Sequence, residues 1–411
     1  MPLSSYSRGL KLIFLANIIS MIGSGMNSAA VIWFILQRTH SELSLGLLMM
    51  LQTVPALIML PFSGVIIDRK DRRRLVMLLD ISRLAIIATV ATLALRHRVQ
   101  LWNVYAMYVL VAAGFWMFWP TINALIQELT PEDKFVHSNT FIMAGVQGGF
   151  LIAGAIVGFV YNHIGLGGVL IIDACTYAFS FSCYLFVRRG VHVVAASGPE
   201  HPHADNEVRR YFYDMRQGFS YLKHHRAFIA VGLCWSLFLS AMMSQGVITA
   251  PLSDRLLHAG AVGFGWLNMG WGTGALLSAT FATALILRRG ADTVTRVAMA
   301  VLALGLFAAP FSRLLAVSVF NWWILGTARG IGGIALQSEF MHRVPKHLMG
   351  RVQNIFYFLG TALQLVISLF IGALAHSVSL TLAFFAVGSI YALAFLAALV
   401  PQPARAQPVP A

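Results

Sequence analysis

Charged residues are scarce in this sequence of 411 residues: 11% are Asp, Glu, Lys or Arg, whereas 58% are hydrophobic. Soluble domains carry about 25% charged residues, so the composition excludes a water-soluble globular fold. Cysteine is rare as well, and because Cys175, Cys183 and Cys234 all lie in apolar stretches we expect no disulfide framework. No phosphate-binding loop and no pair of nucleophile and base stands out, so we expect no enzymatic activity, no cofactor and no metal site.

Long apolar blocks dominate the remaining sequence. A helix needs about 20 apolar residues to cross a bilayer, and about twelve blocks reach that length. We expect an all-α membrane protein, because no ten-residue alternating pattern of a β-barrel is present and open strands are unstable in lipid. The expected spans are 10–37, 43–67, 75–95, 100–124, 137–162, 165–187, 227–252, 259–287, 296–312, 314–338, 353–376 and 379–401.

The net charge of +14 has its source in the loops. Most of the 29 Lys and Arg residues fall in loops on one side of the expected bundle. Because cytoplasmic loops are enriched in Lys and Arg, this asymmetry predicts that both termini are cytoplasmic. No patch of basic and aromatic residues outside the spans indicates nucleic-acid binding.

A long polar segment separates six expected spans from the next six. Its second part, 207–228, has the apolar spacing of an amphipathic helix at the membrane surface. The two sides share a short repeat, Ala124-Leu125-x-x-Glu128 and Ala335-Leu336-x-x-Glu339, at the end of the fourth helix of each half. We therefore expect one half at 1–187, a cytoplasmic linker at 188–226, a second half at 227–401 and a cytoplasmic tail at 402–411.

The loop after the second span contains Gly64-Val-Ile-Ile-Asp68-Arg69-Lys70-Asp71-Arg72-Arg73-Arg74. This resembles motif A of the major facilitator superfamily, G-x-x-x-D-[RK]-x-G-[RK]-[RK], with Asp71 in place of its second glycine. Phe264-Gly265-Trp266-Leu267 and Gly350-Arg351-Val352 further resemble the branch of enterobactin exporters and macrolide efflux proteins. The resemblance implies twelve transmembrane helices in two pseudo-symmetric six-helix halves.

The same resemblance implies a conformational latch. Gly64 would allow close helix approach, and Asp68 would meet the positive end of the eleventh helix. Arg69 belongs to the same latch, and Arg72, three residues after it, would pair with Glu128 at the end of the fourth helix. In the alternative interpretation the basic run only fixes topology, and we assign Arg73 and Arg74 to topology and lipid head groups.

Ionisable residues inside membrane spans are costly and are therefore functional candidates. Asp80 and Arg83 are three residues apart and can pair on one helix face, which indicates a structural role. Asp173, in the sixth span, is either hydrogen-bonded to neutral neighbours or a protonation site. Arg329 lies among glycines of the tenth span, and it could bind an anionic group of a substrate, pair with a carboxylate or serve coupling.

Uncharged residues add further candidates for a substrate cavity. These are Asn17, Asn27, Trp116 and Gln245, although each also fits ordinary helix packing. Flexible Met side chains, such as Met242 and Met243 near Gln245, and flat aromatic side chains suit a large, partly apolar ligand. The fourth span, Val104–Leu125, has no charge, so it lacks the Arg that proton-driven drug exporters carry there.

By resemblance, we expect an exporter in a bacterial cytoplasmic membrane. Its substrate would be an amphipathic organic compound such as a drug or siderophore, moved by alternating access and driven by protons. A lipid or lysophospholipid transporter, or a transport-inactive receptor on the same scaffold, are alternatives. The expected partners are a small-molecule substrate, protons and membrane lipids, with no nucleic acid, and the expected state is a monomer.

Overall fold

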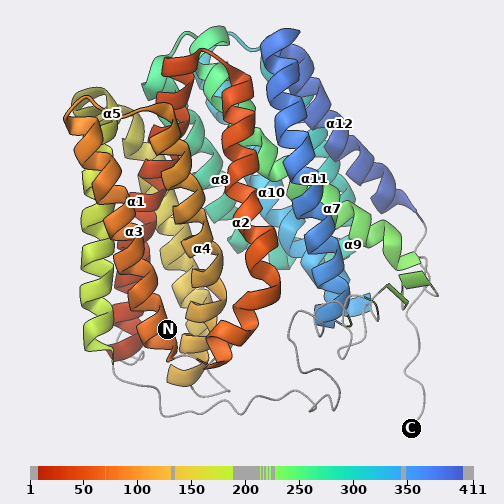
Figure 1. The fold of residues 1–411 in the computed structure, drawn as a ribbon. Helices are drawn as coiled ribbons and strands as arrows, with labels where there is room; N and C mark the ends of the chain where they lie inside the picture. The colour runs from red at the N-terminus through yellow and green to blue at the C-terminus, as the bar shows by residue number, and fades with distance from the viewer. Residues whose placement is uncertain are drawn as a thin grey trace. The chain divides into compact units, whose positions relative to one another are not determined.

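The computed structural model describes residues 8–69, 71–130, 135–187, 227–343 and 349–400, together with scattered positions between 213 and 223. Over these residues every regular element is a helix (Figure 1). The elements are α1 (Arg8–Thr39), α2 (Glu42–Arg69), α3 (Arg72–Leu95), α4 (Leu101–Leu129), α5 (Phe135–Phe186), α7 (Ala227–Pro251), η3 (Leu252–Leu256), α8 (Gly260–Arg289), α9 (Ala291–Ala308), η4 (Ala309–Phe311), α10 (Leu315–Arg343), α11 (Met349–Ser377) and α12 (Leu380–Leu399). Nearly all of the expected linker and the whole tail lie outside the described residues.

The helices have the length and composition of membrane spans. Within the described part of the chain, nine helices are apolar and long enough to cross a bilayer, or ten if the bent helix α8 is one span. The expected all-α membrane fold is therefore confirmed, whereas the count of twelve stays a prediction.

Helix α5 contains two of the expected spans. Gly165 interrupts it with φ +63° and ψ −170°, which is a backbone conformation that glycine adopts without the steric cost of a side chain. The break coincides with the expected boundary between the spans 137–162 and 165–187. A second break follows Pro310 in η4, and it separates α9 from α10 near the expected division at Ser312 and Arg313.

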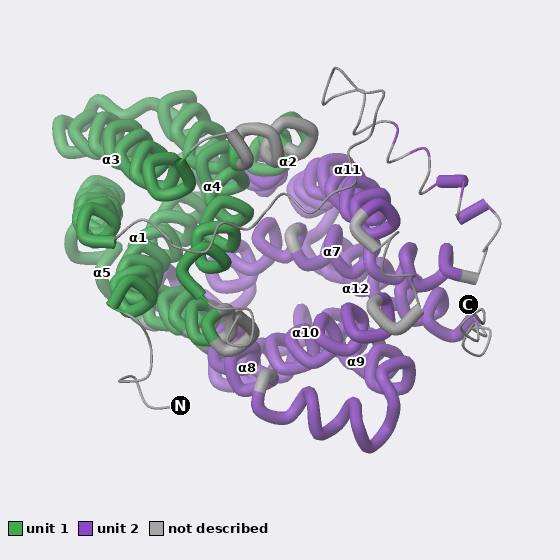
Figure 2. The backbone as a smooth tube through the Cα atoms, turned by 90° about the horizontal axis from the view of Figure 1, so that it is seen from below, with its two compact units in different colours: residues 1–40, 51–207, 264–269 green, residues 41–50, 208–263, 270–411 purple. Residues whose placement is uncertain are grey.

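The chain forms two compact units, which Figure 2 shows in different colours. Unit 1 consists of Met1–His40, Leu51–Glu207 and Phe264–Met269, and unit 2 of Ser41–Met50, Val208–Gly263 and Gly270–Ala411. In unit 1, α1 packs along α5, and α3 packs against α4 and α5. In unit 2, α7 packs against α11 and α12, and α9 packs against α10 and α12.

Glycines let α1 and α5 approach closely in unit 1. A Cβ atom at Gly149 would lie 2.6 Å from the carbonyl oxygen of Ile18, and one at Gly25 would lie 2.6 Å from the Cβ of Ala153. Small residues at helix contacts are a general means of association in membranes, where no hydrophobic effect draws helices together. This close contact brings the polar side chains of α1 against those of α5.

Candidate functional site

Unit 1 contains a small cavity lined by polar, aliphatic and aromatic side chains. Its volume is about 100 Å³. The residues that line it come from α1, α2, α4 and α5, and they are Ser24, Asn27, Ser28, Gln52, Met107, Tyr108, Val111, Ala112, Phe115, Phe150, Asp173 and Tyr177. The cavity thus combines one ionisable carboxyl group with a mostly apolar and aromatic lining.

Asp173 is the acidic residue of this cavity, and its side chain is fully buried. Asn27 Nδ2 donates a hydrogen bond of 2.6 Å to Asp173 Oδ2, and Thr176 Oγ1 lies 3.4 Å from Oδ1. Gly23 makes this arrangement possible, because a Cβ atom there would collide with Thr176 and Asp173. The structure therefore brings together Asp173 and Asn27, two candidates from distant parts of the sequence.

Asp80 and Arg83 form a buried ion pair next to this cavity. Arg83 Nη2 lies 2.8 Å from Asp80 Oδ1, and each residue is 1% exposed. Ser180 Oγ donates to Asp80 Oδ2 at 2.7 Å, and Arg83 Nη1 donates to the Tyr177 hydroxyl at 3.4 Å. The pair is thus joined to α5 as well as being local to α3.

Aromatic rings enclose the Arg83 guanidinium. Its Cζ lies 4.8 Å from the ring centroid of Phe118 on α4 and 4.6 Å from that of Tyr177. A cation over an aromatic face is stabilised electrostatically by the ring. The absence of a side chain at Gly114 leaves room for Arg83, whose Cδ lies 3.2 Å from the position a Cβ would take. Although α4 itself has no charge between 104 and 125, a cation from α3 therefore packs against it.

The motif between α2 and α3 shows one of its expected contacts. Arg72 Nη1 forms an ion pair of 2.8 Å with Glu128 Oε1. Asp71 Oδ1 accepts a hydrogen bond of 3.1 Å from the backbone of Arg74 and so caps the start of α3. The side chains of Gly64, Asp68 and Arg69 lie outside the described residues, so the latch role of the motif stays a prediction.

Arg73 has a role that sequence reasoning did not find. Its Nε donates to the carbonyl oxygen of Tyr184 at 2.7 Å, and its Nη2 donates to that of Leu185 at 2.6 Å. Terminal helix carbonyls lack partners within their own helix, and basic side chains satisfy them. Arg73 therefore caps the end of α5, a role beyond the topological one that the sequence predicts for it.

Arg329 on α10 is the corresponding candidate of unit 2. Its Nη2 lies 2.6 Å from the sulfur of Met242, and its Cζ lies 5.9 Å from the ring centroid of Trp271. Its Nε is buried without a hydrogen-bond partner, and among the described residues no carboxylate forms an ion pair with it. The guanidinium of Arg329 thus contacts a thioether sulfur and an aromatic ring.

The remaining candidates differ in their surroundings. Asn17 Nδ2 donates to the carbonyl oxygen of Ile13 at 2.8 Å and to the Tyr184 hydroxyl at 3.4 Å, and it does not line the cavity of unit 1. Trp116 Nε1 donates to the carbonyl oxygen of Gln52 at 3.4 Å. Gln245 Nε2 is buried, and the part of the chain that the structure describes offers it no hydrogen-bond partner.

A family model described as the Major Facilitator Superfamily matches residues 13–367 of this chain. The chain belongs to the major facilitator superfamily. It is accordingly a multi-pass membrane protein of a family of transporters.

Three bacterial members of the superfamily are similar to this chain. The uncharacterised MFS-type transporter YfiS of Bacillus subtilis (strain 168) is 24% identical over 97% of this chain and 94% of its own length. The multidrug efflux pump Tap of Mycolicibacterium fortuitum is 24% identical over 84% of each protein. Macrolide efflux protein A of Streptococcus pyogenes is 20% identical over 78% of this chain and 72% of its own length. The relatives of this superfamily member thus include efflux proteins.

Solved structures show the same superfamily fold. A crystal structure of the nucleoside transporter NupG superimposes with a TM-score of 0.73 at 14% identity, covering 96% of this chain and 100% of that one. A bacterial homologue of the iron transporter ferroportin, in its inward-facing state, gives a TM-score of 0.73 at 15% identity, covering 97% and 99%.

Unit 2 of this superfamily member also contains an ion cluster that sequence reasoning missed. Glu42, at the start of α2, is fully buried; its Oε1 lies 2.8 Å from Arg255 Nη1, and its Oε2 lies 3.5 Å from His376 Nδ1. The three residues come from α2, η3 and the end of α11. In the sequence Glu42 is only the charged residue that precedes an apolar span, and nothing in its neighbourhood indicates its partners.

Proposed function

We propose that this protein exports an amphipathic organic compound by alternating access, and that proton influx drives the export. The observation that carries the proposal is the buried carboxyl group of Asp173 in a cavity lined by aromatic residues. The kinship with efflux proteins for macrolides and multiple drugs supports the direction of transport.

The charge balance around Asp173 supports proton coupling. Asp80 is satisfied by Arg83 and Ser180, so this pair is neutral as a whole. The hydrogen bonds to Asp173 come from an amide and a hydroxyl group, and no described cation forms an ion pair with it. An unneutralised charge buried in a membrane protein is expensive. A proton, or the cationic group of a ligand, removes that cost.

Exchange of a proton for the substrate follows if the proton and the cationic group of the substrate both neutralise the carboxylate of Asp173. A substrate with a basic nitrogen would place its cation at Asp173, next to Tyr108, Phe115 and Phe150. The cavity volume of about 100 Å³ holds only the cationic end of such a substrate, so its apolar body requires the cavity to widen during alternating access. Because only one of the two partners is needed for neutrality, the arrival of a proton favours release of the substrate. The resulting coupling is reciprocal, since each ligand weakens binding of the other by the same free energy.

Arg83 would supply the buried cation that drug exporters of this superfamily carry on the fourth helix. It packs against Gly114 and Phe118 of α4 and contacts Tyr177, which also lines the cavity. In unit 2, we propose Arg329 as a further contact for electron-rich groups of the substrate. We place the protein in a bacterial cytoplasmic membrane with both termini inside, acting as a monomer.

The test is transport by the purified protein in proteoliposomes with an imposed pH gradient. Basic drugs, siderophores and lysophospholipids are offered separately, and the variants Asp173→Asn and Arg329→Gln are measured beside the wild type. We expect gradient-dependent transport of a basic drug, and a loss of at least about tenfold in Asp173→Asn. Asp254→Asn removes a carboxylate outside the cavity and should transport like the wild type.

Two results would overturn the proposal in different ways. Gradient-driven transport by Asp173→Asn at the wild-type rate would remove the proposed coupling residue. Transport of lysophospholipids alone, or of none of the three classes, would instead contradict the proposed substrate class or the transport function.

A further inference from the structure

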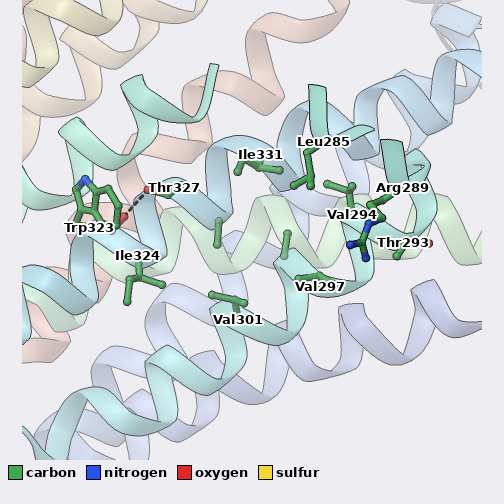
Figure 3. A pocket seen from close by; sticks show the side chains of 12 residues that line it. Leu285, Arg289, Thr293, Val294, Val297, Val301, Trp323, Ile324, Thr327 and Ile331 are labelled. Atoms are coloured by element: carbon green, nitrogen blue, oxygen red, sulfur yellow. Dashed lines mark hydrogen bonds between the residues drawn. The ribbon is translucent and has the colours of Figure 1, made fainter. Parts of the chain in front are cut away.

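A second cavity lies within unit 2, and neither Arg329 nor any other candidate residue of the proposed transport reaction lines it. Its volume is about 420 Å³. Figure 3 shows the side chains that line it, which come from α8, α9 and α10, and they are Leu285, Arg289, Thr293, Val294, Val297, Ala298, Val301, Trp323, Ile324, Thr327, Ala328 and Ile331. The volume falls within the range of about 300–1,000 Å³ of small-molecule sites.

The bend in α8 separates a tightly packed segment from the segment that lines this cavity. The segments Gly260–Ser278 and Thr280–Arg289 differ in direction by 53°. Before the bend, α8 packs closely on α10, since a Cβ atom at Gly326 would collide with the carbonyl oxygen of Trp271. After the bend, Leu285 and Arg289 lie at the cavity.

The walls of the cavity form an apolar stripe along two helices. On α9 the lining residues are Thr293 and the residues one, four, five and eight positions after it. On α10 they are Trp323 and the residues at the same four offsets. This is the spacing of a single helix face, and eight residues correspond to about 12 Å of helix. Val297 is 58% exposed, so the stripe is accessible from the surface of the unit. The shape suits an extended hydrocarbon chain.

One end of the stripe is cationic. Figure 3 places Arg289 and Thr293 together at the end opposite Trp323. Arg289 is exposed, and within the described residues no carboxylate forms an ion pair with it. The carboxylate of Asp292, in the first turn of α9, forms an ion pair of 3.3 Å with Arg296. The start of α9 follows directly, and its free backbone N–H groups add to the positive potential.

We propose that this cavity is a binding site for an anionic glycerophospholipid of the surrounding membrane. One acyl chain would lie along the apolar stripe, and the phosphate would be bound by Arg289, with the Thr293 hydroxyl as a further donor. The pairing of a basic group near the membrane surface with an apolar groove between helices matches the chemistry of such a lipid. The Lys and Arg distribution predicts that Arg289 lies at the cytoplasmic leaflet.

The experiment measures phosphatidylglycerol binding to the delipidated full-length protein in detergent by native mass spectrometry. Phosphatidylcholine is the head-group control, and glycerol 3-phosphate is added as a soluble competitor. We expect Arg289→Gln to weaken phosphatidylglycerol binding about tenfold and Val297→Trp to abolish saturable binding by filling the groove. Arg288→Gln removes the same charge one residue away, outside the lining, and should bind like the wild type.

Several results would overturn the lipid site. Equal losses in Arg288→Gln and Arg289→Gln would show a diffuse attraction of charges, and unchanged binding in Val297→Trp would show that no chain enters the groove. Full displacement by glycerol 3-phosphate would show a site for free phosphate. A dimer that dissociates in Val297→Trp would assign the groove to a second copy of the chain. An unfolding temperature of Val297→Trp equal to that of the wild type shows that the variant is folded, and this control does not depend on the proposed export.

Discussion

Asn27 and Asp173 are 146 residues apart in the chain, yet the amide of one donates a hydrogen bond of 2.6 Å to the carboxyl group of the other. The contact joins α1 to the part of α5 beyond its kink. It fixes the orientation of the carboxyl group at the edge of the cavity in unit 1. If Asp173 exchanges a proton for substrate, this hydrogen bond determines where the carboxyl oxygens point.

Asn27→Leu should therefore impair transport, because it removes the donor that orients Asp173. We expect a loss of about tenfold in the gradient-driven rate in proteoliposomes. Asn17→Leu is the matched control, since Asn17 is equally buried on the same helix but lies outside the cavity lining. Asn17→Leu should lower the temperature of unfolding but leave the gradient-driven transport rate close to that of the wild type. Equal rates in the two variants would contradict the orienting role of Asn27.

The ion pair of Arg72 and Glu128 predicts rescue by charge exchange. Arg72→Glu places two carboxylates together and should reduce transport several-fold, whereas the double variant Arg72→Glu with Glu128→Arg should recover most of the rate. Partly exposed pairs contribute only about 0.2–1 kcal/mol to stability, so the unfolding temperature should change little. Arg74→Glu serves as the control, because the Arg74 side chain is 76% exposed. Failure of the double variant to recover would argue against the pair.

The cluster around Glu42 predicts a stability effect. Arg255→Gln removes the cation that pairs with the fully buried carboxylate of Glu42. We therefore expect a loss of about 1–3 kcal/mol in the free energy of unfolding. Glu42→Gln combined with Arg255→Gln removes the charge as well and should restore much of that loss. Thermal unfolding in detergent measures both. Additive losses in the double variant would show that the two residues do not interact.

Close packing of α8 on α10 predicts a steric effect at Gly326. A methyl group there would collide with the carbonyl oxygen of Trp271, so Gly326→Ala should destabilise the protein by about 1–3 kcal/mol. Gly148→Ala is the control, because the Cβ it adds meets only the end of the Ile18 side chain, at 3.8 Å. Equal unfolding temperatures for the two variants would show that the helices move apart without cost.

The helices could be predicted from the sequence because their lengths and boundaries follow from local composition and from glycine and proline breaks. Gly165 and Pro310 mark boundaries that the apolar pattern already indicates. The pairing of Asp80 with Arg83 could also be predicted, because the two residues are three positions apart on one helix and so lie on the same face.

Contacts between helices could not be predicted in the same way. Asn17 and Asn27 look alike in the sequence, but only the packing of α1 on α5 places Asn27 against Asp173. The additional contacts of Arg83 with Tyr177 and Phe118 depend on how α3, α4 and α5 meet. Glu42 was missed because its partners are more than 200 residues away.

The local pairing of Asp80 and Arg83 has a consequence for biogenesis. A single charged side chain costs about 2.5–3.5 kcal/mol at the centre of a helix that is being inserted by the translocon. Because both charges belong to α3, they can enter lipid already neutralised, before α5 has left the ribosome. Asp173 is synthesised later, and its hydrogen-bonding amide on α1 is by then in the bilayer. The order of synthesis thus supplies Asp80 and Asp173 with their partners in time, whereas Glu42 precedes both of its partners, Arg255 and His376, in the chain.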